Sequence, residues 1–293
     1  VNVLSIGYFG FKGGIFTILT GGGYRVWGPE DSFISDNNSL AVAIIVCIPL
    51  INYLRTIYTN RWAKLGLMLL MILCAVSALG SQSRGALIAI TLMGLIYWYR
   101  SRRKLFSGIA ISILAIVLIS FMPASWEQRM GTISTYEQDG SAVSRLIAWR
   151  FCFNLANDRF FGGGFEIYNW PTYWLYAPEG AYKPFAAHSI YFSVLGEHGY
   201  VGLIFFLLIW FFAFRIGSQI RKNTKSRKDL LWLHFLAGMC QVSLVGYLAG
   251  GTFLSLAYFD LPYNILIVLV AYQRWLKTES SQEIASKDVL PSV

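Results

Sequence analysis

Charged residues are scarce in this chain of 293 residues, of which Asp, Glu, Lys and Arg make up only 13%. Soluble domains carry about 25%, and 56% of this chain is hydrophobic. The composition therefore excludes an ordinary soluble domain and predicts a membrane protein. Cysteine is scarce too, with four residues placed mostly in apolar segments, so a framework of structural disulfides is not expected.

Metal-ligand patterns are also missing. The sequence contains neither a CxxC nor an HExxH pattern, so it predicts no metal site and no cofactor. No signal peptide is visible, and the chain begins at Val1 rather than at Met. We expect further N-terminal sequence to precede it in the intact protein.

What the chain has in abundance is long apolar segments and aromatic residues, the latter reaching 16% as expected of two interfacial belts. A membrane span needs about 20 mostly apolar residues. The candidate segments are residues 40–54, 65–80, 86–99, 105–122, 190–214, 230–250 and 253–272. The pattern predicts an all-α polytopic membrane protein with about seven spans in this chain.

Four parts follow from these segments. Residues 1–122 are expected to form an external, Gly-rich loop, partly inserted around residues 9–19, followed by four spans. Residues 123–187 form a large polar loop with amphipathic helices, residues 188–276 form the remaining spans, and residues 277–293 form a disordered tail.

The distribution of positive charge predicts the orientation. Most of the 24 Lys and Arg residues fall in alternate connections, within residues 55–64, 100–104, 215–228 and 274–287. By the positive-inside rule these connections are cytoplasmic, and the polar loop 123–187 faces the other side. The net charge of +9 is therefore a topology signal and an attraction to anionic membrane lipids, and a nucleic-acid partner is not predicted.

Two arginines are candidates for anion binding. Arg84 lies among small residues between the second and third predicted spans, at the outer boundary. A guanidinium there is costly without an anionic partner, and its planar fork fits phosphate. Arg145 and Trp149 share a face of a predicted amphipathic helix in the loop. An Arg at lipid headgroups and an exposed loop charge are the plain alternatives.

His188 stands where the loop re-enters the membrane, with Tyr191 on its face if the helix has begun. A neutral His can act as a base near pH 7, although a lone His is more often structural. Asp260 lies inside the last predicted span, where an acid is a functional hypothesis by default; a capped helix break at Pro262 is the alternative. Residues 162–164, Gly-Gly-Gly, indicate a tight turn rather than a phosphate loop.

Taken in order, these motifs resemble one known family. The first two are Ser-Gln-Ser-Arg-Gly at 81–85 and the loop helix with Arg145 and Trp149. The others are His-Ser-Ile-Tyr at 188–191 and Gly-Glu-His-Gly-Tyr-Val-Gly at 196–202. The set is similar to the O-antigen ligase and polymerase superfamily of bacterial envelopes. Residues 12–16 and 25–29 resemble the branch of O-antigen ligase-like proteins associated with exosortase A systems.

The resemblance implies an all-helical, GT-C-like membrane glycosyltransferase in the bacterial inner membrane, with its active loop facing the periplasm. Such an enzyme moves a glycan from undecaprenyl pyrophosphate to an acceptor, most often a lipid A–core sugar, without a metal. Arg84 and Arg145 match the two essential arginines of the family and His188 matches its histidine. Asp260 matches a family acid less closely. Members have about twelve spans, so about five would precede Val1.

Other functions remain open from the sequence. A polymerase of exopolysaccharide or O-antigen units and a protein O-oligosaccharyltransferase share the donor chemistry and differ in the acceptor. A transporter of lipid-linked glycans would need a charged central pathway and internal repeats, whereas the informative charges here gather at the outer boundary. A scaffold of an envelope complex would tolerate replacement of Arg84, Arg145 and His188.

Overall fold

The computed structural model describes residues 1–101, 103–124, 126, 131 and 140–288, and within them every extended regular element is a helix. The predicted all-α polytopic class is confirmed. The helices are α1 (Asn2–Leu19), α2 (Asn37–Ile57), α3 (Arg61–Gly80), α4 (Arg84–Arg100), α5 (Lys104–Ser120), α7 (Gly140–Asp158), α8 (Trp170–Tyr176), α9 (Ile190–Thr224), α10 (Leu231–Gly251) and α11 (Asp260–Asp288).

Five helices among the described residues are long and apolar enough to cross a membrane: α1, α2, α3, α9 and residues 228–251, which include α10. The last four coincide with predicted spans. The predicted spans 86–99 and 105–122 correspond to α4 and α5, each of 17 residues. Five rather than seven helices thus meet the length and composition of a span.

Helix α1 corrects the expectation of an external loop over the first 38 residues. Its glycines lie buried on one side, where α1 packs closely on α3. A Cβ added to Gly14 would lie 2.8 Å from the Cβ of Leu73, and one on Gly7 would lie 3.4 Å from Leu70. Glycine here permits close helix packing, as in many membrane helices, and does not signal a loop.

The last predicted span is also wrong at its start. Residues 252–259 are not helical, and α11 begins at Asp260 and runs to Asp288, so Asp260 is the first residue of a helix. Tyrosines supply hydrogen-bond donors to buried carbonyls of this connection. Tyr247 Oη donates to the carbonyls of Leu256 (3.0 Å) and Ala257 (3.3 Å), and Tyr263 Oη also donates to Ala257 (2.7 Å). Non-helical backbone at membrane depth needs such partners.

The tail predicted to be disordered is helical as far as Asp288, and residues 289–293 lie outside the described part.

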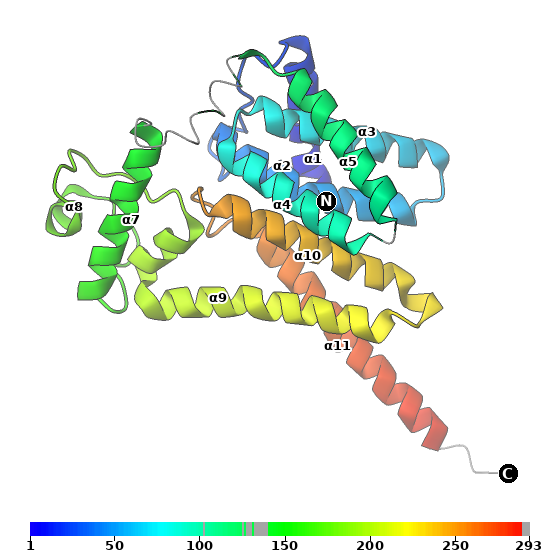
Figure 1. Cartoon of the computed structure of the whole chain (residues 1–293). Coiled ribbons are helices and arrows are strands. Elements are labelled where there is room, and N and C mark those ends of the chain that lie inside the picture. The colour runs from blue at the N-terminus through cyan, green and yellow to red at the C-terminus, as the bar shows by residue number, and fades with distance from the viewer. Residues whose placement is uncertain (102, 125, 127–130, 132–139, 289–293) are drawn as a thin grey trace.

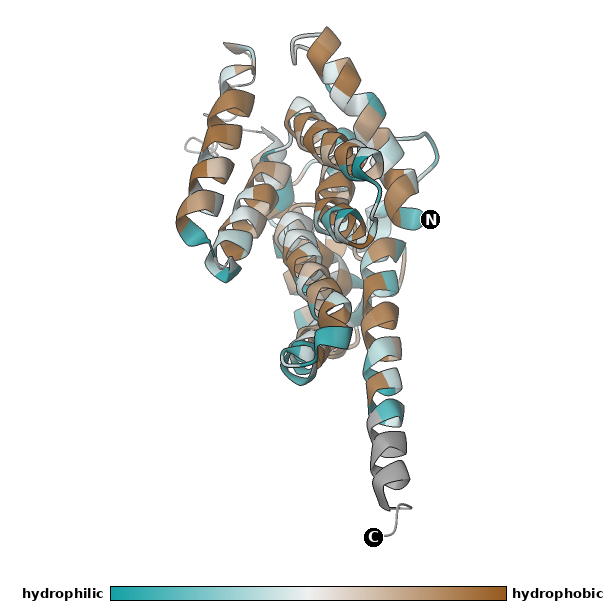
Figure 2. Cartoon of the chain, turned by 90° about the vertical axis from the view of Figure 1, so that its right-hand side faces the viewer, coloured by the Kyte–Doolittle hydropathy of each residue, from teal (hydrophilic) through white to brown (hydrophobic). Residues whose placement is uncertain are grey.

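The core of the bundle lies around α2 and α10. Helix α2 packs against α1, α3, α4 and α10, and α10 also packs against α9. Ser243 Oγ donates to the carbonyl of Val46 (2.8 Å), which ties these two central helices together. The helices are hydrophobic over much of their length (Figure 2), and many of these side chains are exposed: on α5, Leu105 is 80% exposed and Ile116 64%. This outward apolar surface suits contact with lipid.

The polar loop folds on a small core of its own, beside the start of α9 and away from α1 to α5 (Figure 1). Helix α7, helix α8 and the segment leading to α9 bury Phe151, Leu155, Ile167, Tyr173 and Ala187 together. We call residues 140–187 the loop region. All four cysteines of the chain are free and buried, including Cys152 in this core.

The loop region joins the membrane bundle at a kink in α9. Gly199 has φ +65° and ψ −163°, so the helix is interrupted there. Gly163 N–H donates to the carbonyl of Gly196 and Gly164 N–H to that of Glu197, both at 2.9 Å, and Tyr200 N–H donates to Phe160 (3.1 Å). The turn lies just before the predicted residues, since Gly162 N–H donates to the carbonyl of Arg159 (2.7 Å). Residues 162–164, with positive φ at Gly162 and Gly164, dock on the kink.

Candidate functional site

Arg84 begins α4 directly after a buried polar turn. Ser81, Gln82 and Ser83 are all buried, and Ser83 Oγ accepts the N–H of Ala86 (3.2 Å), which caps the helix so that it starts at Arg84. Gln82 has φ +56°, a conformation that is strained for any residue except glycine. The guanidinium and the positive end of the helix dipole make this corner suited to an anion.

Other segments hold this turn in place. Asn37 Nδ2, at the start of α2, donates to the carbonyl of Ser81 (2.7 Å). Gln82 Nε2 donates to the carbonyl of Gly22 (3.2 Å), in the connection between α1 and α2. The segment before α2 therefore contributes to the site, and Asp36, which caps α2 through the N–H groups of Asn38 and Ser39, lies next to it.

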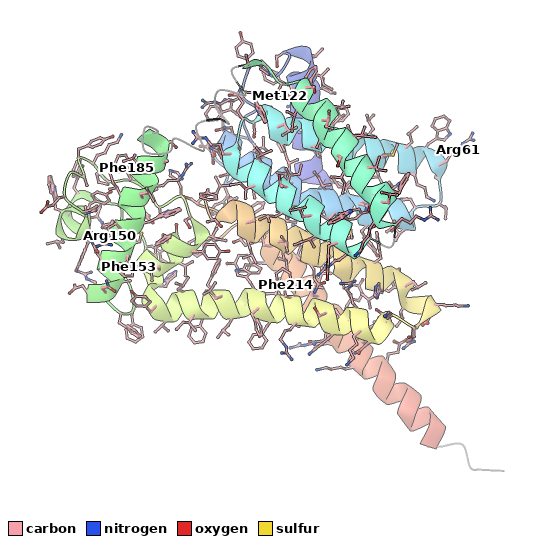
Figure 3. All side chains as sticks on the ribbon, in the orientation of Figure 1. Arg61, Met122, Arg150, Phe153, Phe185 and Phe214 are labelled. Atoms are coloured by element: carbon pink, nitrogen blue, oxygen red, sulfur yellow. The ribbon has the colours of Figure 1, made fainter. Side chains whose placement is uncertain are left out.

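Arg145 and Trp149 lie one turn apart on α7, as predicted. Trp149 Nε1 donates to the carbonyl of Ala187 (2.8 Å), and its ring stacks on Phe192 with the centroids 4.8 Å apart and the planes 7° apart. These contacts fasten α7 to the residues on both sides of His188. Arg150, farther along α7, lies on an exposed flank with its guanidinium over the Phe153 ring (Figure 3).

His188 lies before α9 and not on it. Ser189 is the N-cap of the helix. His188 has φ +43°, so its side chain does not follow the helical arrangement of the residues after it. Its Nδ1 forms a hydrogen bond with Ser255 Oγ at 3.3 Å. The expectation that Tyr191 shares a helical face with His188 is therefore wrong, and Tyr191 Oη donates instead to the carbonyl of Leu248 on α10 (3.1 Å).

The surroundings of His188 keep its imidazole neutral. Burial lowers the pKa of His188 below its ordinary value, and the charge of Arg145 lowers it further, whereas the charge of Asp36 opposes both. Arg145 and Asp36 are thus both within electrostatic reach of His188. A neutral imidazole can accept a proton at pH 7.

The connection 252–259 brings Arg84 and His188 to the same region. A Cβ added to Gly85 would lie 3.5 Å from the Cβ of Phe253, and the Phe253 ring is 6.2 Å from Trp149. Ser255, two residues later, bonds to His188. Asp260 follows this connection at the exposed start of α11, where a carboxylate is favourable at the helix dipole. The structure thus gathers Arg84, Arg145, Trp149 and His188 around one connection.

A second polar cluster on the same connection was not predicted. Tyr258 Oη donates to the carboxylate of Glu197, and His198 Nε2 lies 2.9 Å from the same hydroxyl. Burial and the bond to Glu197 raise the pKa of Tyr258, so it stays a phenol. The Tyr258 hydroxyl thus bridges Glu197 and His198, and no sequence spacing connects residue 258 to residues 197 and 198.

The geometry defines a multi-pass membrane protein with a cationic site at one end of its bundle, where the loop region meets α4, α9 and the connection 252–259. Among the described residues, no three His, Cys, Asp or Glu side chains are grouped so that they could hold a metal ion.

The O-antigen ligase family model matches residues 69–207, a stretch that includes Arg84, Arg145 and His188. This part of the chain is similar to the O-antigen ligase family, and the match supports the resemblance that the motifs indicate. This similarity supports a membrane enzyme of the general O-antigen ligase type. No curated protein matches the chain. The exosortase-associated branch, which rests on residues 12–29, stays a prediction.

Proposed function

We propose that this protein transfers a glycan from undecaprenyl pyrophosphate to an acceptor hydroxyl, most favourably on a lipid A–core sugar. The observation that carries the proposal is the placement of His188, which is hydrogen-bonded to Ser255 and within electrostatic reach of Arg145. Gly85, next to Arg84, faces Phe253 in the same connection as Ser255. A base and a pair of guanidiniums are what such a transfer requires.

In the proposed reaction the acceptor oxygen attacks the anomeric carbon of the first sugar as the bond to pyrophosphate breaks. Negative charge grows on the leaving pyrophosphate, and Arg84 and Arg145 stabilise it with preplaced N–H donors. His188 takes the proton of the attacking hydroxyl. One displacement on the face opposite the leaving group inverts the anomeric configuration. Trp149, Tyr191 and Asp260 are proposed to border the sugars and orient them.

The proposed location is the inner membrane of a bacterium, with the site at the periplasmic face. The support is the distribution of charge. Arg55, Arg100 and Arg221 lie at the C-terminal ends of α2, α4 and α9, whereas the candidate site lies at the N-terminal ends of α4 and α9. Positive charge concentrates on the cytoplasmic side of membrane proteins.

The test is reconstitution of the purified chain in EDTA with an undecaprenyl-pyrophosphate glycan, with and without lipid A–core, followed by gel analysis and mass spectrometry. Transfer that depends on lipid A–core is the expected result. Lengthening of the lipid-linked glycan without lipid A–core would make the protein a polymerase. Transfer to a protein hydroxyl, in an added third arm, would make it an oligosaccharyltransferase. Full turnover by a well-inserted Arg84→Ala or His188→Ala variant would contradict the mechanism.

A further inference from the structure

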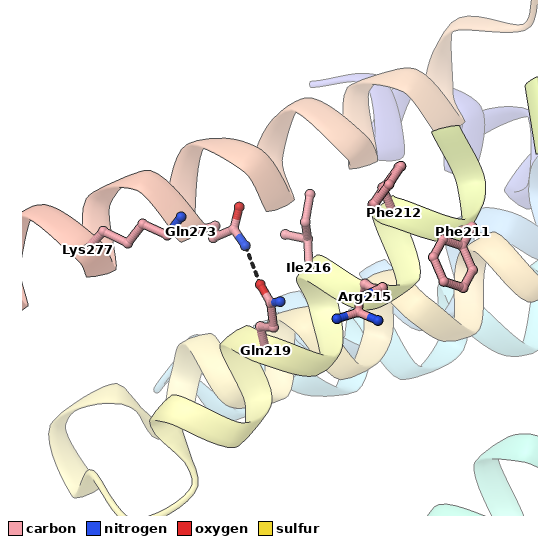
Figure 4. A pocket seen from close by; sticks show the side chains of 7 residues that line it. All are labelled: Phe211, Phe212, Arg215, Ile216, Gln219, Gln273 and Lys277. Carbon is pink, nitrogen blue, oxygen red and sulfur yellow. Dashed lines mark hydrogen bonds between the residues drawn. The ribbon is translucent and has the colours of Figure 1, made fainter. Parts of the chain in front are cut away.

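A hollow groove lies between α9 and α11, at the end of α9 far from His188. It consists of two adjoining hollows of about 450 and 590 Å³ that share Gln219, Gln273 and Lys277 in their walls (Figure 4). Phe211 begins the groove 21 positions after Ile190, the first residue of α9. At 1.5 Å per helical residue the groove is about 30 Å from the start of that helix. It is therefore separate from the site around His188.

The lining of the groove combines aromatic and cationic side chains, and the Arg215 guanidinium lies over the Phe211 ring at 5.9 Å. Phe211 and Phe212, each 53% exposed, form one end together with Ile216. Arg215, Lys222 and Lys277 add three positive charges. Figure 4 shows Phe211 and Phe212 on one side of the bridging glutamines and Lys277 on the other. Such a surface matches a molecule with an anionic head and an apolar body.

Polar groups that could bond to the head are already in position. Gln273 Nε2 donates to Gln219 Oε1 (2.5 Å), which joins α11 to α9 across the groove. The nearby acids Asp229 and Glu279 both bond to Arg227, at 2.9 and 3.3 Å, so their charge is directed at that residue. Amide N–H groups and several cations within one groove can surround a phosphate.

We propose that this groove binds an anionic phospholipid, with the phosphate between Arg215, Lys222 and Lys277 and the acyl chains along Phe211 and Phe212. The apolar run of α9 ends at Phe214 and is followed at once by Arg215, which places the groove at the level where headgroups meet hydrocarbon. Basic pockets between membrane helices bind acidic headgroups in this way. The lipid would brace α11, which extends away from the bundle beyond this point (Figure 1).

The experiment is native mass spectrometry of the full chain in detergent, with equal amounts of phosphatidylglycerol and phosphatidylcholine. The groove variant is Arg215→Gln with Lys222→Gln and Lys277→Gln. The control variant, Lys225→Gln with Lys228→Gln and Arg274→Gln, loses the same charge at the same end but leaves the groove lining intact. Gel filtration and circular dichroism verify that both variants are folded. A third arm measures the thermal unfolding midpoint with phosphatidylglycerol and, separately, with inorganic phosphate.

We expect the wild type and the control to retain phosphatidylglycerol in preference to phosphatidylcholine. The groove variant should bind phosphatidylglycerol about a hundredfold more weakly, since each cation near an anionic headgroup contributes about fivefold. Equal weakening in the control would reduce the effect to general surface attraction and overturn the proposal. Equal retention of phosphatidylcholine by the wild type would also overturn it, as would stabilisation by inorganic phosphate as large as that by the lipid.

Discussion

His188 and Gln82 both hold backbone conformations that residues with a side chain rarely adopt, at φ +43° and φ +56°. Each such conformation costs about 1 to 3 kcal/mol and persists only when its surroundings impose it. Here the bonds from Ser255 to His188 and from Gln82 to Gly22 contribute to that support. Strain at these two positions, one of them two residues from Arg84, is consistent with a site built before the substrate arrives.

The two arginines are expected to act through the shape of the guanidinium as well as through its charge. Arg145→Lys keeps the charge but loses the planar fork, so transfer from the lipid-linked donor should fall about a hundredfold. The matched control is Arg150→Lys on the same helix, where the guanidinium lies over Phe153 on an exposed flank. Its turnover should stay within about twofold of the wild type. Equal losses in the two variants would remove Arg145 from the proposed role.

The pH dependence of transfer should reflect His188. Because burial and Arg145 lower its pKa, the base stays neutral, and kcat/KM should stay level below the ordinary histidine value of about 6.5. Asp36→Asn removes the charge that opposes this shift but keeps an N-cap for α2. The acid limb of its pH profile should therefore move to lower pH, whereas in Arg145→Gln it should move to higher pH. Limbs that do not move in either variant would contradict the assignment of His188 as base.

The lowered pKa of His188 should also make the folded chain less stable at acidic pH. The unfolded chain binds a proton on His188 at higher pH than the folded chain does, because the folded pKa is the lower one. Stability should therefore be fully present above the ordinary pKa and fall as pH decreases toward the folded value. In His188→Gln, which has no ionisable group there, the unfolding midpoint in detergent should lose this part of its pH dependence.

At the scale of the elements, the kink of α9 determines where the loop region sits. Gly199→Ala would place a Cβ against the backbone of Phe160 and at 2.6 Å from the nitrogen of Gly162, at a φ of +65°. Gly164→Ala has a similar φ, +81°, but an open space around the new atom. The φ strain alone costs about 1 to 3 kcal/mol, so both variants should be less stable and Gly199→Ala clearly the less stable of the two. Thermal unfolding in detergent measures the difference, and equal midpoints would show that the docking is loose.

Hydropathy alone predicted the helices that are long, apolar segments of the sequence. Residues 40–54, 65–80 and 190–214 are apolar and lie in α2, α3 and α9. The break at residues 252–259 was not predictable, because Phe253, Leu254 and Leu256 continue the apolar pattern of a span. The carbonyls of the break are satisfied by the Tyr247 hydroxyl, a contact that the sequence pattern does not indicate. Helix α1 was missed because glycine favours both loops and close helix contacts, and only the facing surface of α3 distinguishes the two.

The candidate site was predictable only in part. Arg84, Arg145 and His188 could be selected because their types suit pyrophosphate and proton transfer and because they lie at the outer boundary of the predicted spans. The contacts of Ser255 with His188 and of Tyr258 with Glu197 join segments about 60 positions apart. Such contacts depend on how α9 and α10 pack, and no local pattern encodes them.

At the scale of the whole molecule, the bundle presents its basic connections at one end and the candidate site at the other. We expect a Glu179→Cys variant, in the loop region, to react with a membrane-impermeant maleimide on intact spheroplasts. A Thr59→Cys variant, between α2 and α3, should react only after the membrane is permeabilised. Both positions are exposed, and the four native cysteines are buried and can be replaced to lower the background. The opposite labelling pattern would invert the proposed orientation.

The docking of residues 160–164 on α9 is made largely by main-chain amides and carbonyls. Almost every residue type carries these backbone groups, so the contact between residues 160–164 and α9 restricts few residue types except at its glycines. A Cβ on Gly162 would come within 2.5 Å of the Glu197 carbonyl, and one on Gly196 within 2.6 Å of Ile167. The surface of the loop region can therefore diverge while its attachment persists. If the site works as proposed, exposed side chains within residues 165–187 can change, and the acceptor with them, while the arginines proposed to bind the donor stay in place.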